Sequence, residues 1–278
     1  MSTHSLDETA EQASAFSFAK LDASLTAPPV FLSAGCDGTL TLVARGDHIP
    51  ARYRRAMHAF RFSQYWRLGF LDAHQVDIDV YCDELVGYPP DREFHTIVLD
   101  RHSGRAAAYV YLAIPDPDSA GAPFALEKEY DLTVGETIGK GLERARVWEA
   151  KRLVRRVGMP WSSMARNSPW WAMLGMSQAI GALHKRGHLD AFVADGAPDG
   201  SPRIFELLGF DVHRLDVKPR VTNVDGRYGP MWRQRTVPVP YICENREGQG
   251  EHLRGVEEFL QGNQGLSVRE TLAAWRQA

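Results

Sequence analysis

Short apolar runs alternate along most of this chain with longer stretches whose apolar residues recur at helical spacing. Strands are predicted over residues 39–45, 93–100, 105–114, 189–194, 210–217 and 236–244, and helices over 50–65, 169–185, 201–208, 251–261 and 267–277. Gly104, in the short turn between two of the strands, indicates a hairpin. Pro238 and Pro240 favour an edge position for the last strand, because proline cannot donate to a strand ladder. This order predicts a mixed α/β sheet with helices on its faces.

One predicted strand, residues 147–154, contains an acid and a base within its apolar pattern, Glu149 and Arg152. Burial of a carboxylate and a guanidinium is costly unless each has a partner, and such residues are common at reactive sites. The alternative is a structural ion pair or two residues that face solvent. The two side chains point to opposite faces of a regular strand, and a β-bulge between them would change that.

Composition narrows the classes of function. The fractions of hydrophobic and charged residues, 44% and 24%, are typical of a soluble globular protein, and the net charge of −3 gives no global signal for nucleic acid or an acidic membrane. No apolar stretch approaches the length of a membrane-spanning helix. Cys36, Cys82 and Cys243 are odd in number and far apart, which argues against a disulfide framework and favours a reduced, cytoplasmic location. No metal site is expected from the spacing of His184 and His188, since Gly187 separates them.

Residues 1–29 have no apolar run long enough for a signal peptide, and acidic residues occur early. We expect this segment to form a mobile, partly helical tail.

The segment Arg203-Ile204-Phe205-Glu206-Leu207-Leu208-Gly209-Phe210, near the end of this order of elements, resembles the late helix of the GNAT acyltransferase fold. Within that superfamily the chain is more similar to the autoinducer (acyl-homoserine-lactone) synthases and the long-chain N-acyl amino acid synthases. The matching motifs occur in the family order: Phe60-x5-Trp66, Asp79-Val80-Tyr81 with Asp83, Pro123-Phe124 with Tyr130, and Trp148-Glu149-x-x-Arg152-Leu153. Two positions depart from the family pattern: Ala56 replaces an arginine, and the aspartate pair is one residue wider.

The resemblance implies a GNAT-like acyltransferase domain over residues 30–217, with a central mixed sheet and helices on both faces, and a C-terminal extension over 218–278 on or beside it. It implies transfer of a fatty-acyl group from a thioester to the amine of a small molecule, such as an amino acid or S-adenosylmethionine. The second acceptor would allow lactone formation and quorum sensing.

The resemblance also suggests roles for single residues. Glu149 would act as general base or orient the water that does so, and Arg152, with Asp79, would position the substrates. Asp79 and Asp83 would bind the cationic part of the acceptor, or be loop carboxylates in solvent. Trp66 and Phe60 would line the acceptor or phosphopantetheine region, or pack in the core.

The sequence after the predicted strand 147–154 bears on the identity of the acyl donor. Residues 155–169 lack the glycine-rich pattern with which GNAT enzymes hold the pyrophosphate of coenzyme A, and the autoinducer synthases share this loss and generally use acyl carrier protein. Six basic residues lie close together in the sequence: Arg144, Arg146, Lys151, Arg152, Arg155 and Arg156. Arg146, Arg155 and Arg156 are the candidate contacts to an acidic carrier protein or its phosphate, the alternative being a solvated cationic face.

We therefore expect acyl carrier protein or coenzyme A to carry the acyl co-substrate, with no bound cofactor and no nucleic-acid partner. Two other interpretations stay open: a coenzyme-A-dependent acetyltransferase, and a catalytically silent GNAT-like domain that binds a ligand or partner.

Overall fold

The computed structural model describes residues 3–35, 37–76, 88–114, 123–134, 142–159, 163–198, 200–233, 238–262, 270 and 273–274. Its strands form one eight-stranded sheet in the spatial order β1 (Phe31–Ala34), β2 (Thr39–Arg45), β3 (Glu93–Asp100), β4 (Ala106–Ala113), β5 (Val147–Arg155), β6 (Ala191–Gly196), β8 (Val239–Asn245) and β7 (Phe210–Arg214). Neighbouring strands are antiparallel except β5 and β6, which are parallel. The predicted mixed sheet is confirmed.

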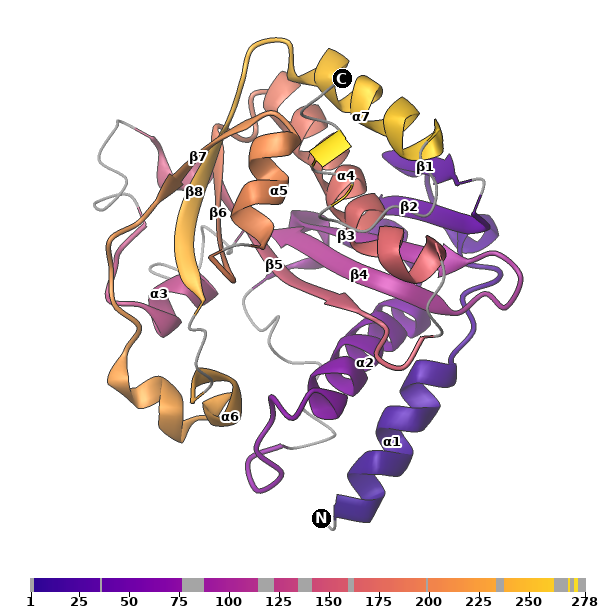
Figure 1. Cartoon of the computed structure of the whole chain (residues 1–278), viewed down its shortest axis with the longest axis vertical. Helices are drawn as coiled ribbons and strands as arrows, with labels where there is room; N and C mark the ends of the chain where they lie inside the picture. Colours follow the sequence, from indigo (N-terminus) through magenta and orange to yellow (C-terminus); the bar gives the residue numbers. More distant parts are fainter. Residues whose placement is uncertain are drawn as a thin grey trace.

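Helices cover both faces of the sheet (Figure 1). One face carries α1 (Thr3–Ala15) and α2 (Ala51–Arg67), and the other carries α4 (Ser163–Lys185), α5 (Ser201–Leu207) and α7 (Gln249–Gly262). The short helices α3 (Ala125–Glu129) and α6 (Gly229–Trp232) lie in the connections after β4 and β7. No helix in the described ranges is long and apolar enough to cross a membrane.

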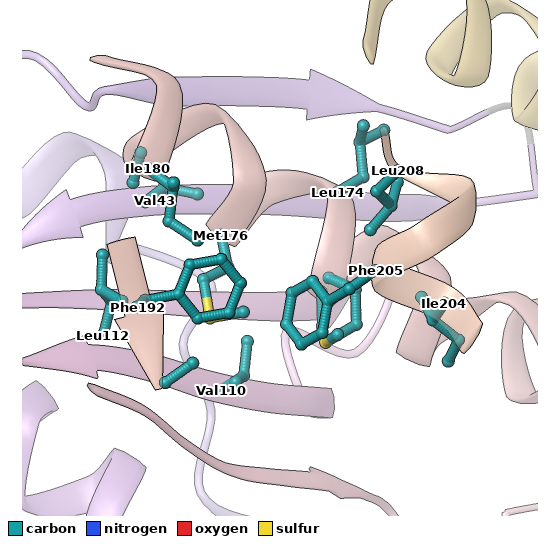
Figure 2. Close-up of a cluster of buried hydrophobic side chains, with 14 of the residues drawn as sticks. Val43, Val110, Leu112, Leu174, Met176, Ile180, Phe192, Ile204, Phe205 and Leu208 are labelled. Atoms are coloured by element: carbon teal, nitrogen blue, oxygen red, sulfur yellow. The ribbon is translucent and has the colours of Figure 1, made fainter. Parts of the chain in front are cut away.

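The core under α4 and α5 consists mainly of apolar side chains, with the buried Thr41 and Thr96 beside Gly175 of α4. Figure 2 shows Leu174, Met176 and Ile180 of α4 against side chains of β2 and β4, with Phe192 of β6 and Phe205 of α5 beside them. Phe192 and Phe205 form an edge-on pair with ring centroids 4.8 Å apart. The methionine and leucine side chains of α4 therefore pack in the core.

The N-terminal segment is packed against the domain, whereas the sequence predicted a mobile tail. Leu6 and Ala10 of α1 are buried, and Ser14 Oγ lies 3.0 Å from Ser63 Oγ of α2. Phe18 and Leu21, after the helix, are also buried. Few apolar residues anchor the helix among polar ones, so the stretch resembles a solvated tail in the sequence although it covers one flank of α2.

The last predicted strand is internal, which corrects the edge position suggested by its prolines. β8 pairs with β6 on one side and β7 on the other. Only Pro240 lies inside the strand, one residue from its start, so that a single donor is lost while its carbonyl accepts the amide of Leu215 at 3.0 Å. Because β8 follows residue 217, the part of the chain predicted as an extension supplies a strand within the sheet.

Candidate active site

A cleft opens where the two parallel strands separate. β5 and β6 pair only between Val147–Glu149 and Ala191–Val193, although β5 continues to Arg155 and β6 to Gly196. A cavity of about 610 Å³ lies at this end of the strands, with Leu153, Val154 and Arg155 of β5 and Asp195 and Gly196 of β6 in its walls. Beyond Glu149 the facing edges of β5 and β6 do not pair with each other, so backbone donors and acceptors along the cleft are open to a ligand.

A β-bulge in β5 determines which side chains reach each face. Tyr111 pairs with Lys151 and Tyr109 with Val154, so two residues of β5, Arg152 and Leu153, lie opposite the single residue Val110. After the bulge, Leu153 packs with the core under α4 and Val154 with the core under α2. A β-bulge is the feature that would change which faces of the strand Glu149 and Arg152 occupy, and it occurs at Arg152 itself. The side chain of Arg152 is outside the described part of the structure.

Glu149 is buried and fully engaged. Only 3% of it is exposed, and its carboxylate accepts hydrogen bonds from the amides of Ala125 (3.0 Å) and Leu126 (2.8 Å) and the hydroxyl of Tyr88 (3.2 Å). Lys151 Nζ lies 2.9 Å from Glu149 Oε2, and both side chains are about 4% exposed. The ionic partner of Glu149 described in the structure is thus Lys151, two residues along the strand and on the same face.

The hydroxyl of Tyr88 forms hydrogen bonds with both Glu149 and Lys151. Lys151 Nζ donates to the Tyr88 hydroxyl at 2.9 Å, and the ammonium also lies 4.1 Å from the centre of the ring. Burial, followed by the negative charge of Glu149, raises the pKa of the Tyr88 hydroxyl well above its ordinary value. The phenol therefore keeps its proton and donates a hydrogen bond to Glu149.

The carboxylate of Glu149 also fixes the start of α3. It accepts hydrogen bonds from the first two amides of this helix, which have no hydrogen-bond partner inside the helix. Glu127 of α3 is held in turn by the two terminal guanidinium nitrogens of Arg144 and by the amides of Phe124 and Val134. Burial opposes ionisation of Glu127, but these donors outweigh it and lower its pKa. Glu149 consequently connects the sheet to the α3 connection.

A second row of buried polar side chains lies under α2. His95 Nε2 is 3.0 Å from Glu93 Oε2, and His95 Nδ1 is 2.8 Å from the Tyr109 hydroxyl. His58 and Arg61 of α2 are also buried, and the rings of His58 and His95 meet edge-on at 5.7 Å. Burial, and then the charge of Arg61, holds the pKa of His58 well below its usual value. Sequence reasoning missed this row, whose only signal was two polar residues, Glu93 and His95, at alternate positions of an apolar strand.

The two described residues proposed for the acceptor, Phe60 and Trp66, lie away from the cleft. Asp79 and Asp83 lie outside the described residues. Phe60 is fully buried in the core under α2, as its packing alternative predicted. Trp66 is directed to α1, where its indole nitrogen donates to Asp7 at 2.7 Å, and its ring stacks on Phe62 at 6.5 Å. Neither aromatic side chain lines the cleft between β5 and β6.

The basic residues do not form one surface. Lys151 is buried, Arg144 is paired with Glu127, and Arg146 forms an ion pair of 2.5 Å with Asp190 away from the cleft. Arg155 is exposed and lines the cleft.

Arg156 also lines the cleft, but it is tied to the protein, since it donates to the carbonyls of Ala106 (2.7 Å) and Ser14 (2.9 Å). Burial and the neighbouring Arg105 lower the pKa of Arg156 to about 10. Alternation along β5 and local ion pairs separate charges that are adjacent in the sequence.

Comparison with known proteins gives similarity to solved structures at low sequence identity. No protein-family model matches the chain, and no curated protein matches it. Among solved structures, the AHL synthase LasI is similar with a TM-score of 0.47 and 15% identity over 78% of this chain and 95% of that one. FeeM, an N-acyl amino acid synthase from uncultured soil microbes, has a TM-score of 0.47 and 11% identity over 75% and 92%. The coenzyme-A-dependent acyl-homoserine lactone synthase BjaI, solved with SAM and isopentyl-CoA, has a TM-score of 0.42 and 14% identity over 82% and 90%. FdhC, a nucleotide-linked sugar GNAT, is similar to the same low degree, with a TM-score of 0.43 and 10% identity over 83% and 97%.

Proposed function

We propose that this protein transfers an acyl group from a thioester to the amine of a small molecule, with the donor bound in the cleft between β5 and β6. The observation that carries the proposal is the separation of the two parallel strands immediately after Glu149. It places an open-ended cleft beside a buried network of an acid, a base and a phenol. The sequence motifs around Glu149 support the same reaction.

The cleft suits the arm of a thioester donor. A phosphopantetheine arm is an extended chain with amide groups, and it can hydrogen-bond to strand edges in the way that an added strand does. Leu68, Phe70 and Met159 supply apolar wall, and Arg155 and Arg156 are the cations near which its phosphate would bind. The same arm occurs in acyl carrier protein and in coenzyme A, and we favour the carrier protein because residues 155–169 lack the glycine-rich pattern.

The reaction requires that the acceptor amine loses a proton and that its nitrogen attacks the thioester carbonyl. The C–N bond then forms, the C–S bond breaks, and the thiolate leaves and takes up a proton. Glu149 already accepts from four donors, which favours its role as the group that orients Tyr88, Lys151 and any water between them. Arg152, at the bulge between this network and the cleft, is proposed to act beside it. Asp79 and Asp83 remain candidates for contact with the acceptor.

Mass spectrometry of lipid extracts from cells that overproduce the wild type tests the proposal, with the Glu149→Ala variant as the comparison. We expect new N-acyl species only with the wild type, and their masses would reveal the amine and the chain length together. Glu251→Gln, a change on the exposed face of α7, serves as a matched control and should give the wild-type pattern. Identical extracts from wild type and Glu149→Ala, with both proteins folded, would favour a ligand-binding domain without catalysis.

A further inference from the structure

A second cavity lies beside the N-terminal half of α2, and the residues that line it differ from those that line the cleft. Its volume is about 260 Å³, and it is lined by Arg54, Arg55 and His58 of α2, by Tyr88, and by Glu93 at the start of β3. This space exceeds that of a single water and suits a small metabolite. Tyr88 connects it to Glu149 and Lys151, because the same side chain lines the cavity and bonds to both.

Three polar atoms of these lining residues have no hydrogen-bond partner among the described residues: Arg54 Nε, His58 Nδ1 and Glu93 Oε1. Glu93 is 2% exposed and His58 is 5% exposed. A buried polar atom that lacks a partner is costly, so native proteins retain few of them, and a bound molecule that supplies the missing partner is one explanation for those retained. The other carboxylate oxygen of Glu93 is already fixed by His95 at 3.0 Å, which orients the carboxylate.

The charges around the cavity select a ligand that carries both signs. Two guanidinium groups, Arg54 and Arg55, stand on one element, and one carboxylate, Glu93, stands on another. A simple cation would face the two arginines, and a simple anion would face the carboxylate, so each would leave like charges together. Because burial keeps His58 neutral, its ring adds a hydrogen-bonding nitrogen without a further positive charge.

We propose that this cavity binds the acceptor of the acyl transfer as a small zwitterion, whose carboxylate contacts Arg54 and Arg55 and whose ammonium contacts Glu93. The assignment rests on the proposed function, but the binding itself does not require a donor. It places the acceptor at the start of α2 and the start of β3, in place of the two aromatic residues, Phe60 and Trp66, expected from the sequence.

Saturation-transfer NMR on the full chain without donor tests this assignment. The probes are the common L-amino acids, each measured singly, followed by the amine and the acid that correspond to the best ligand without its carboxylate or without its ammonium. We expect one or more amino acids to bind, and both truncated analogues to bind at least tenfold more weakly. Glu93→Gln, which keeps size and removes charge, and Arg54→Gln should each weaken binding at least tenfold, whereas Glu251→Gln on α7 should not change it.

The outcomes separate this assignment from the proposed reaction. Absence of binding by every amino acid to the wild type, or equal binding by wild type, Glu93→Gln and Arg54→Gln, overturns the zwitterion site. Arg54 is only partly buried, so its variant keeps the test valid if Glu93→Gln fails to fold. Binding that obeys the expected pattern without acyl transfer from any donor supports the site and rejects the reaction. Acyl transfer that persists in both variants shows that the acceptor binds elsewhere.

Discussion

The ion pair between Glu149 and Lys151 makes a quantitative prediction about stability. Both side chains are about 4% exposed, so solvent screens their interaction little. We consider Lys151→Met, which leaves the carboxylate without its cation, Glu149→Gln, which leaves the ammonium without its anion, and the double variant, which contains neither charge. Removal of one partner of a buried pair destabilises a protein by roughly 3–5 kcal/mol, because the remaining charge is buried without compensation.

The double variant should be much less harmed than the sum of the two single variants. It has no charge at either position, and the glutamine side chain at position 149 can still accept a hydrogen bond from one of the two α3 amides that Glu149 binds. We expect a coupling free energy of about 2–3 kcal/mol between the two positions, the upper part of the range for residues in contact. Since the free energy of unfolding of a typical domain is about 5–15 kcal/mol, each single variant should lose a large share of its stability.

Urea denaturation followed by tryptophan fluorescence measures the four free energies of unfolding, and equal m-values across the cycle show that the same transition is compared. Arg246 and Asp211 provide a control pair, with a distance of 2.6 Å but about half-exposed side chains. The cycle of Arg246→Met and Asp211→Asn should give a coupling below about 1 kcal/mol. Single-variant losses below about 1 kcal/mol at Glu149 and Lys151, with no coupling, would refute the claim that burial makes this pair interdependent.

Three further predictions concern packing, pH and the cleft. Gly175→Ala places a methyl group 3.0 Å from side chains of β2 and β3, and thermal unfolding should show a loss of about 1–3 kcal/mol from overpacking despite the better helix propensity; an unchanged or raised Tm contradicts the close contact. His58 has a folded pKa far below its unfolded value of about 6.5, so the unfolded chain binds more protons below that pH and stability falls with acidification. Relative to His58→Phe, the wild type should lose about 1.4 kcal/mol more per pH unit below pH 6 in urea denaturation, and parallel pH profiles would contradict this. Leu153→Trp should narrow the cleft and lower acyl transfer in the lipid extracts while amino-acid binding persists, whereas full transfer would show that the donor lies elsewhere.

Local patterns sufficed for most elements of the sheet. The hairpin of β3 and β4 and the helices α2 and α5 follow from alternation, helical spacing and turn residues. α4 begins at Ser163, six residues before the predicted start at Pro169. Proline is favoured in the first turn of a helix but does not exclude helix before it, because it removes only one backbone hydrogen bond. The position of β8 between β6 and β7 was beyond sequence reasoning, since spatial strand order depends on contacts between distant segments.

For the site too, local sequence patterns identified some residues and could not identify others. Glu149 was identified from its place in an apolar strand, but the sequence motif directed attention to Arg152. Its ionic partner is Lys151, two residues along the strand, which alternation places on the same face. Tyr88 is separated from Glu149 by about sixty residues, and the row of Glu93, His95 and Tyr109 combines two strands with a helix above them. Such contacts are fixed by register and helix packing, which single-sequence patterns do not encode.

The two faces of the central strands have different chemistry, and this explains how the fold tolerates so many buried polar groups. On β4 and β5 the residues that face α4 are apolar, as Val110, Leu112 and Trp148 show, and those that face α2 include Tyr111 and Lys151. Because alternate residues of one strand serve opposite faces, the apolar face can stabilise the sheet while the polar face holds charges in fixed positions. The bulge in β5 preserves this division: it returns the apolar Leu153 to the α4 face and brings Val154 to the α2 face at the point where the cleft begins. An insertion or deletion at the bulge would exchange the two sets of side chains, so the register of β5 links the stability of the domain to its candidate chemistry.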